Sequence, residues 1–252
     1  MKILLSPAKK LDFSSEKTFL EDSVYPFSRE SKMIMRELSS YSSLDLSKLM
    51  KISTNLSVLN KDRNENWTFP FPEEKSKQSL LCFKGEVYQN MDLDSFSKSD
   101  FDFTNKTLRI LSGLYGILKP SDLILPYRLE MGTNLKVGES KNLYYFWKKS
   151  LTTHLLKEIK EDEFLVNLAS DEYFKVIDKK KVKIPIITPV FKDVKNGKAK
   201  VISFFAKRAR GKMCSFILKN KINSVEEIKT FNKDNYIFSD KESTENTLVF
   251  IR

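Results

Sequence analysis

A strong excess of basic residues is confined to one stretch of the chain. Between Lys175 and Lys221 there are fifteen lysines and arginines and only two acids, Asp178 and Asp193, a net charge of +13. The whole protein carries +11, so the rest of the chain is close to neutral. Basic charge that is concentrated in this way creates a local field that attracts polyanions. A solvated, lysine-rich surface is the alternative interpretation of the same run.

The basic stretch contains a predicted β-hairpin. Asn196-Gly197 lies between two apolar segments, 186–194 and 199–205, and this dipeptide favours a two-residue type I′ turn. The turn fixes the register of the two strands, because alternate side chains must point to opposite faces. It places Asp193 opposite Lys200, and we expect this cross-strand pair on the solvent face.

Lys192 is a candidate catalytic amine within this hairpin. The predicted register puts it on the apolar side, together with Val190 and Val194. Such a lysine either extends its stem toward an edge of the sheet or points into a lined cavity. In a desolvated cavity the pKa of the ammonium group falls, and the neutral amine can then act as a base or nucleophile.

The segment 206–219 follows the hairpin and has the periodicity of an amphipathic helix. Arg208 and Lys212 lie on the stripe that we expect to face solvent. Lys207 and Arg210 lie between that stripe and the buried one, in the first turns, near the free N–H groups of the helix N-terminus. This position suits a phosphate or a carboxylate. The expected buried stripe consists of Ala206, Ala209, Met213, Phe216, Ile217 and Asn220.

Polar residues stand where predicted strands end. Ser6 and Lys9 follow the first strand of the chain. Asn167 and the residues from Ser170 to Glu172 mark the end of a strand at 164–168, where Ser170 is placed to cap a short helix. Ligands of open α/β sheets bind outside the carboxyl ends of the strands, so we expect these residues to line one cleft. The basic stretch adds Lys192, Lys207 and Arg210 to this predicted cleft.

The remaining chain alternates between predicted strands and helices. Helices are expected at 31–40 and 44–63, and a closing hairpin from 236–238 and 247–251. This order indicates an α/β fold, a mixed α/β domain with a central sheet, helices around it and a basic cleft. No linker or repeat divides the 252 residues, so we expect a single domain, 1–252, that acts as a monomer. No apolar run reaches the ~18 residues of a membrane span, and we expect a cytoplasmic protein without a membrane partner.

Composition excludes several classes of site. His154 is the only histidine, so zinc and iron sites built from several histidines are ruled out, and we expect this residue on a helix surface. Cys82 and Cys214 stand among apolar neighbours and are expected to be buried free thiols. No Walker loop, dinucleotide fingerprint or Cys-x-x-Cys motif occurs. The sequence therefore predicts no metal site and no cofactor.

Six long, ordered motifs are distributed along the chain. They are Leu4-Leu5-Ser6-Pro7-Ala8-Lys9, Phe83-Lys84-Gly85-Glu86-Val87-Tyr88, Leu111-Ser112-Gly113-Leu114-Tyr115-Gly116-Ile117-Leu118-Lys119-Pro120, Pro126-Tyr127-Arg128-Leu129-Glu130-Met131-Gly132, Asn167-Leu168-Ala169-Ser170-Asp171-Glu172-Tyr173-Phe174 and Lys207-Arg208-Ala209-Arg210-Gly211. These motifs closely resemble those of the YaaA peroxide-stress protein family. The resemblance spans residues 1–252 and implies a cytoplasmic bacterial protein that limits iron-dependent damage during hydrogen peroxide stress. It also implies an α/β fold peculiar to the family, with a basic cleft and a helix-hairpin-helix element that binds DNA.

Two segments are candidates for the implied helix-hairpin-helix element. In 111–119, Gly113 and Gly116 would let backbone N–H groups approach a phosphate, although their Gly-x-x-Gly spacing departs from the usual Gly-x-Gly. The segment 44–63 contains two helical patterns but no glycine. The alternative for the two glycines is a tight turn beneath the core.

Arg128 and Glu130 suggest a second kind of site. They are two residues apart, which on an extended strand places both on one side. With Lys84, Tyr88 and Asn167 they could hold a nucleotide or a flipped base, with Glu130 as acid or base and a lysine as nucleophile. The alternative is a structural ion pair between Arg128 and Glu130.

Two functions follow from these patterns. The favoured one is a peroxide-stress protein that binds double-stranded DNA through phosphate contacts and with little sequence preference. The alternative is an enzyme that acts on a nucleotide or nucleic-acid base in the same cleft, with Lys192 and Glu130 as candidate catalytic residues. A nucleotide or phosphate is the small ligand that both functions share. The predicted phosphate-binding residues are Ser6, Lys9, Lys84, Gly113, Gly116, Arg128, Asn167, Ser170, Lys192, Lys207 and Arg210.

Overall fold

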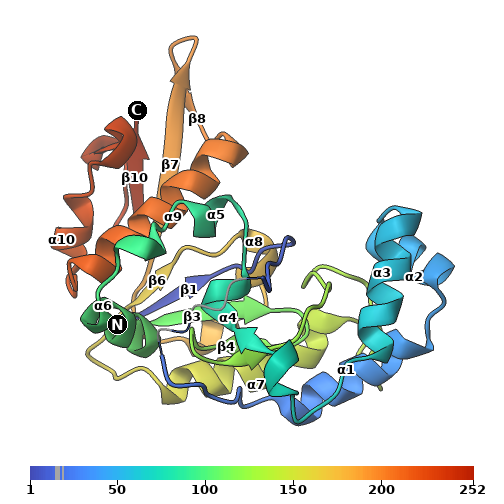
Figure 1. Cartoon of the computed structure of the whole chain (residues 1–252). Coiled ribbons are helices and arrows are strands. Elements are labelled where there is room, and N and C mark those ends of the chain that lie inside the picture. Colours follow the sequence, from blue (N-terminus) through green and yellow to red (C-terminus); the bar gives the residue numbers. More distant parts are fainter. Residues whose placement is uncertain (15–17, 19) are drawn as a thin grey trace.

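The computed structural model describes residues 1–14, 18 and 20–252. Over these residues an eight-stranded sheet has the order β4-β3-β1-β6-β7-β10-β9, with β8 paired to β7 (Figure 1). A small two-stranded sheet joins β2 to β5. The strands are β1 (Lys2–Leu5), β2 (Lys77–Gln78), β3 (Leu108–Ser112), β4 (Gly116–Leu118), β5 (Leu123–Ile124), β6 (Leu165–Asn167), β7 (Ile186–Lys195), β8 (Lys198–Lys200), β9 (Ile237–Phe238) and β10 (Thr247–Ile251).

The centre of the large sheet is parallel. Strand β1 pairs in parallel with β3 on one side and with β6 on the other, and β6 and β10 both run parallel to β7. Ile3, Leu4 and Leu5 are fully buried, because a central parallel strand is covered on both faces and reads as a continuous apolar run. The antiparallel strands β4 and β9 lie at the edges, which makes the sheet mixed. The predicted α/β class is therefore confirmed.

Ten α-helices surround the sheet in the described part of the chain. Helices α5 and α6 both contact α9, α7 contacts β4, and α2 contacts α3. In Figure 1 the β7–β8 hairpin projects at the top of the molecule, and the α2–α3 pair stands apart from it at the right. The helices are α1 (Ser28–Ser40), α2 (Ser43–Met50), α3 (Thr54–Glu65), α4 (Ser79–Cys82), α5 (Glu86–Gln89), α6 (Lys98–Thr107), α7 (Leu143–Lys157), α8 (Asp171–Phe174), α9 (Ser203–Lys219) and α10 (Val225–Lys229).

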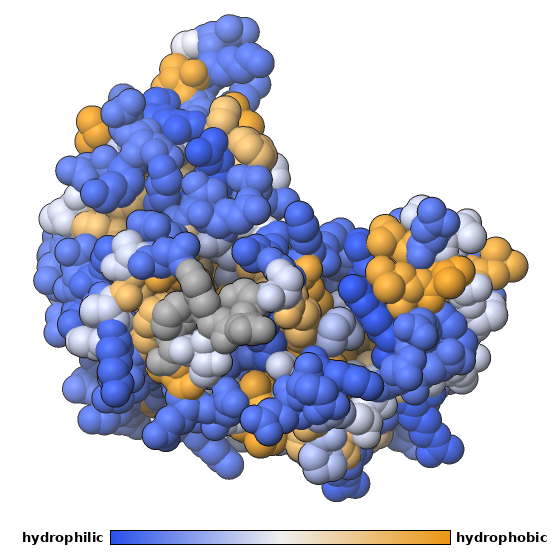
Figure 2. Space-filling view, in the orientation of Figure 1, coloured by the Kyte–Doolittle hydropathy of each residue, from blue (hydrophilic) through white to orange (hydrophobic). Residues whose placement is uncertain are grey.

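The segment 44–63 forms the two predicted helices, α2 and α3. Ser42 and Ser53 cap their N-termini, and Lys51 ends α2 in the left-handed conformation with φ of 53°. Helix α3 buries the polar residues Ser57 and Asn60. Its exposed apolar side chains contribute to the hydrophobic patch over α2–α3 in Figure 2. The exposed residues are Leu44 on α2 and Leu56, Val58 and Leu59 on α3.

The segment 111–119 is not a helix-hairpin-helix element. It forms the β3–β4 hairpin, in which Ser112 pairs with Gly116, and the segment 111–118 is buried throughout. A Cβ atom on Gly113 would lie 2.4 Å from the carbonyl oxygen of Leu129. Gly116 has φ of +76° and packs against the side chains of α7. The prediction that these glycines contact a phosphate is wrong, because the core requires them for close packing.

The hairpin in the basic stretch has the predicted turn. Asn196 and Gly197 have positive φ, and the register pairs Asp193 with Lys200. Its second strand is shorter than predicted, because α9 begins at Ser203 with a backbone bond from the N–H of Ala206 to the carbonyl of Ile202. The predicted helix start near Ala206 was therefore a few residues late.

The two faces of the hairpin are opposite to our expectation. Asp193 is buried, where it accepts hydrogen bonds from the hydroxyl of Tyr236, at 2.9 Å, and from the guanidinium of Arg252. Val194 is 55% exposed, and Lys192 forms an ion pair with Glu242 at 2.6 Å. The predicted solvent-exposed pair of Asp193 and Lys200 does not form, because partners far along the chain stabilise the buried carboxylate.

A buried ion pair joins β3 to the C-terminal end of α7. The Arg109 side chain is 4% exposed and donates to both carboxylate oxygens of Glu158, at 2.6 and 3.0 Å. Burial acts to raise the pKa of Glu158, but the hydrogen bonds and charge of Arg109 prevail and lower it. His154 is half buried, 3.8 Å from Glu158, and burial lowers its pKa. The expected surface histidine therefore belongs to a partly buried cluster.

We predict that Glu158→Gln lowers the free energy of unfolding by about 2–3 kcal/mol at pH 7, because Arg109 stays buried and loses its charged partner. The lowered pKa of Glu158 means that its contribution is complete above the unfolded-state value of about 4.3 and is lost as pH falls through the folded-state value. Urea titrations should therefore show a constant difference from pH 6 to 8 that shrinks below about pH 4. The control Glu161→Gln, at an exposed position, should change little; an equal loss would contradict the assignment.

Candidate functional site

A cleft of about 560 Å³ opens at the carboxyl ends of β1 and β6. The chain leaves β1 toward β3 on one side and later returns to β6 on the other side of β1. Such a switch in strand order creates the crevice in which open α/β sheets bind ligands. Ser6 directly follows β1, and Ser170 precedes α8 in the loop after β6; both line the cleft. The prediction that residues at these two strand ends meet is confirmed.

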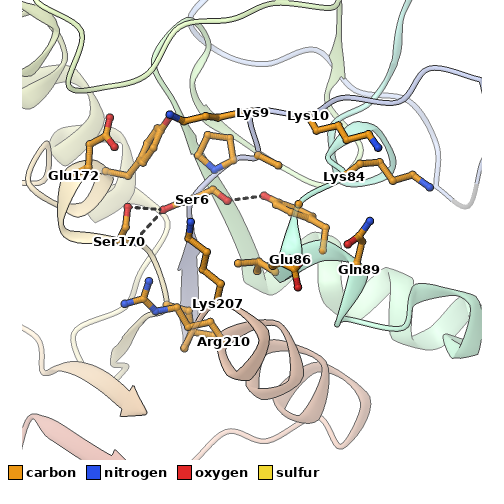
Figure 3. Close-up of a pocket in the computed structure, with 17 residues that line it drawn as sticks. Ser6, Lys9, Lys10, Lys84, Glu86, Gln89, Ser170, Glu172, Lys207 and Arg210 are labelled. Atoms are coloured by element: carbon orange, nitrogen blue, oxygen red, sulfur yellow. Dashed lines mark hydrogen bonds between the residues drawn. The ribbon is translucent and has the colours of Figure 1, made fainter. Parts of the chain in front are cut away.

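Hydrogen bonds join the two strand ends across the cleft floor (Figure 3). The backbone N–H of Ser170 donates to the hydroxyl of Ser6 at 2.9 Å, and the two hydroxyl oxygens lie 3.2 Å apart. The Tyr88 hydroxyl donates to the carbonyl of Ser6 at 2.8 Å. Ser170 caps α8 by position, but its side chain makes no capping bond because it contacts Ser6.

Cations dominate the polar lining of the cleft. Five cations face two carboxylates, those of Glu86 and Glu172. Figure 3 shows the cations on two sides, with one group on α9 and the other on the loops after β1 and before α5. Glu172 is also engaged, since it accepts a hydrogen bond from the N–H of Gly132 at 3.0 Å. The cations are Lys9, Lys10, Lys84, Lys207 and Arg210.

The cations differ in how far other side chains neutralise them. Lys9 lies 3.1 Å from Glu130, and Lys84 lies 3.3 Å from Asp12. Among the described residues, Lys10, Lys207 and Arg210 have neither an ion pair nor a hydrogen-bond acceptor for their side chains. Lys10 and Lys207 are exposed to solvent, whereas Arg210 is partly buried, so the α9 side carries the uncompensated charge that water solvates least.

Arg210 is the most informative of these side chains. Its guanidinium is partly buried, and burial lowers its pKa, with only a smaller opposing effect of Asp171. A buried charge without hydrogen-bond partners is unfavourable unless a ligand compensates it. A guanidinium presents paired donors that match phosphate or carboxylate oxygens. The geometry of this residue therefore fits an anionic ligand.

Close packing of α9 against α5 positions both cations. A Cβ atom on Gly211 would lie 2.1 Å from the carbonyl oxygen of Val87. Because α9 begins at Ser203, Lys207 and Arg210 lie in its second and third turns. The predicted help from free N–H groups of the helix N-terminus is therefore wrong for these two residues, although both line the cleft.

Arg128 and Glu130 form the structural ion pair that we gave as the alternative. Arg128 Nη2 lies 3.1 Å from Glu130 Oε1, the same oxygen that Lys9 approaches. These side chains flank a small recess beside the cleft, and Arg128 Nε is buried without a hydrogen-bond partner among the described residues. Glu130 therefore reaches the cleft only through Lys9.

Two further predicted site residues lie outside the cleft. Asn167 is buried in β6, where its side-chain oxygen accepts from the N–H of Ala169 at 3.1 Å and stabilises the turn. Lys192 pairs with Glu242 and does not line the cleft. Gly113 and Gly116 belong to the core, as described above. Six predicted residues do meet in the cleft: Ser6, Lys9, Lys84, Ser170, Lys207 and Arg210.

A family model described as peroxide stress protein YaaA matches residues 1–242. The chain belongs to this family. A UPF0246 protein of Flavobacterium psychrophilum is 49% identical over 252 residues, and the alignment covers 100% of both chains. A UPF0246 protein of Aliivibrio fischeri strain MJ11 is 47% identical over 254 residues, with 100% of this chain and 98% of the relative covered. A UPF0246 protein of Clostridium botulinum is 48% identical over 255 residues, with 99% of this chain and 98% of the relative covered.

Several lining residues were absent from the predicted site. Lys10, Glu86 and Gln89 all border the cleft. Glu86 lies in one of the motifs that carry the resemblance to the YaaA family, and Lys10 directly follows another. Their location in or beside these motifs was the sequence signal that could have identified them as lining residues. Gln89 is also in α5, one turn after Gly85, whose loop packs tightly on Ala8.

The YaaA-family chain shows two further features in its described residues. It contains no group of three or more histidine, cysteine or acidic side chains arranged to hold a metal ion. No helix among these residues has the length and apolar character required to cross a membrane. Cys82 and Cys214 are buried free thiols, as predicted, and burial raises the pKa of both.

We predict that neither thiol of the native protein reacts with hydrogen peroxide or an aromatic disulfide reagent, because the thiolate is the reactive form and burial disfavours it. Absorbance titration should detect no thiols in buffer and both in ~8 M urea. Rapid oxidation of Cys82 or Cys214 in the folded protein, detected by mass spectrometry, would contradict this assignment.

We also predict that Arg210→Met leaves the free energy of unfolding unchanged or raises it by about 1 kcal/mol, because it removes a desolvated charge without a partner. The same substitution should abolish the increase in melting temperature that inorganic phosphate gives to the wild-type protein at constant ionic strength. Lys157→Met, at an exposed position at the end of α7, is the matched control and should change neither quantity. A large destabilisation by Arg210→Met would show that the guanidinium has a structural role.

Proposed function

We propose that this member of the peroxide-stress family acts in the cytoplasm as a monomer that binds double-stranded DNA without sequence preference and thereby limits iron-dependent damage. The observation that carries the proposal is the pair of uncompensated cations, Lys207 and Arg210, on the α9 side of the cleft. Phosphate is the anion that DNA presents at every nucleotide, and phosphate contacts carry no base information.

The dimensions of the cleft support contact with the edge of a duplex. A volume of about 560 Å³ accepts one phosphate with its sugar, whereas the body of the duplex must lie across the mouth. Lys9, Lys10 and Lys84 line the side opposite α9, so they are placed to contact neighbouring phosphates. The exposed Lys195 and Lys198 at the tip of the β7–β8 arm extend the basic surface beyond the cleft.

Counterion displacement offers a physical route to protection. DNA condenses cations around its phosphates, and a bound protein releases those whose phosphates it neutralises. Ferrous iron is a divalent cation and belongs to this condensed population. A protein that covers phosphates with lysine and arginine therefore keeps iron away from the backbone and bases that peroxide chemistry would attack.

The alternative, an enzyme acting on a nucleotide or base, receives less support from the geometry. Lys192 lies outside the cleft, and one oxygen of Glu130 is shared by Lys9 and Arg128. What favours the alternative is the recessed floor, where Ser6 and Tyr88 lie beside the cations. Incubation of the protein with deoxynucleoside monophosphates, followed by chromatography for a released base or phosphate, tests it directly.

We predict that binding to a blunt duplex weakens linearly in log salt, with a slope of ~0.9 per phosphate contacted. Replacing Lys207 and Arg210 together by alanine should weaken binding and lower the slope by about 1.8, because two contacts are lost. The charge-matched control replaces Lys157, the last residue of α7, and Lys160, on the connection to β6; both are exposed and neither lines the cleft.

Fluorescence anisotropy at several salt concentrations measures both effects. The control double variant should keep the wild-type slope. Equal losses in the two double variants would mean that only total charge matters, and a flat salt response of the wild-type protein would exclude DNA binding through phosphate contacts.

A further inference from the structure

An exposed aromatic ring stands beside the uncompensated cations. Phe204 lies in the first turn of α9 and is 49% exposed. It precedes Lys207 by three residues, so the two side chains lie on the same side of the helix, one turn apart. Lys207 lines the cleft, whereas Phe204 is not among the lining residues, so the ring lies on the part of α9 beside the cleft. Half of a large apolar side chain is thus left in water next to the uncompensated cations.

The surroundings of this ring are basic. The Arg208 guanidinium lies 5.7 Å from the centre of the Phe204 ring, and its Nε donates to the side-chain oxygen of Asn90 at 3.4 Å. The neighbouring ring of Phe205 meets Phe204 edge to face, at 5.7 Å between centres and 65° between planes, and is itself covered by Arg252 at 4.5 Å. Arg208 thus lies over one face of the Phe204 ring and Phe205 contacts it edge to face, while about half of the side chain stays open to solvent.

The occupant of such a ring must be apolar or aromatic on one face and negatively charged nearby. A nucleobase attached to its phosphate satisfies both requirements, since every base has a π-face and carries an anion within one nucleotide. In an intact duplex the bases are stacked on one another, so their faces are not available to a protein side chain. Only an unpaired nucleotide can use the ring and the cations together.

We propose that Phe204 is a stacking residue for an unpaired nucleobase, and that Lys207 and Arg210 hold the phosphate of the same strand. This inference rests on the proposed binding of nucleic acid through phosphates and adds a preference for single-stranded segments. Stacking is tolerant of base identity, so the preference is for strandedness and not for sequence.

Four variants separate the ring from the charge around it. Phe204→Ala removes the ring, and Phe204→Leu keeps an apolar side chain that has no π-face. Phe204→Trp keeps an aromatic ring with a larger π-face. The matched control is Val201→Ala, because Val201 is 53% exposed and lies just before α9. The probes are a single-stranded DNA oligonucleotide containing 2-aminopurine and a blunt duplex of equal length. Thermal unfolding of each variant confirms that the fold is retained.

We expect Phe204→Ala and Phe204→Leu to weaken single-strand binding about tenfold, as is typical when one stacked contact is removed. They should also lose the quenching of 2-aminopurine fluorescence, while duplex affinity and its salt slope change less than about twofold. Phe204→Trp and Val201→Ala should resemble the wild-type protein.

The inference is overturned if Phe204→Ala binds the single strand as the wild-type protein does, or if single-strand and duplex affinities fall equally. Salt dependence keeps this failure apart from that of the proposed function. If the wild-type protein binds the duplex with a steep salt slope but Phe204 adds nothing to single-strand binding, only the stacking inference fails. If the wild-type protein binds neither probe, both the inference and the proposed function fail. Phe204-dependent binding to anionic phosphatidylserine vesicles, without single-strand binding, would assign the ring to a membrane surface and also overturn it.

Discussion

The parallel pairing of β1 with β6 is the constraint on which the site depends. It brings residue 6 and residue 170 together although 164 positions separate them, and the hydrogen bond from the Ser170 N–H to the Ser6 hydroxyl fixes their spacing at 2.9 Å. Both strands end at the same edge because they are parallel, so the two loops must diverge there and leave a crevice. The Tyr88 hydroxyl ties the third wall, α5, to the same carbonyl. Strand pairing and these hydrogen bonds therefore fix the positions of the segments that form the cleft floor.

Arg210 carries a charge in this cleft that the fold itself does not require. The Arg109–Glu158 pair and the Asp193–Arg252 pair show how this chain treats buried charges whose role is structural: each has a charged partner within hydrogen-bond distance. Arg210 is partly buried in the same protein and has none among the described residues. Within one molecule the contrast is informative, because a desolvated cation without a partner lowers stability unless a ligand supplies the missing anion.

The sequence predicted the residues whose position follows from local rules. Strand ends placed Ser6 and Ser170, and helical periodicity placed Lys207 and Arg210 between the buried and solvent-facing stripes. Prediction from the sequence failed where residues far along the chain determine which side chains are buried. The hairpin register was right, yet its faces were reversed because Tyr236 and Arg252 stabilise the Asp193 carboxylate from 43 and 59 residues away. Gly113 and Gly116 had the composition of a phosphate loop, but Leu129 and the side chains of α7 require them in the core. Local charge density likewise did not delimit the cleft, since Lys9, Lys10 and Lys84 come from outside the basic stretch.

Under the proposed function, the chemistry of the cleft and of Phe204 accounts for nucleic-acid binding without sequence preference. A guanidinium recognises the phosphate that all nucleotides share, and an exposed phenyl ring recognises a π-face that all bases share. Neither group tests the donors and acceptors on a base edge, which are the features that distinguish one base pair from another. Damage by iron and peroxide is likewise not confined to particular sequences. A site built from Arg210, Lys207 and Phe204 can therefore respond to the exposure of phosphates and unpaired bases wherever they occur.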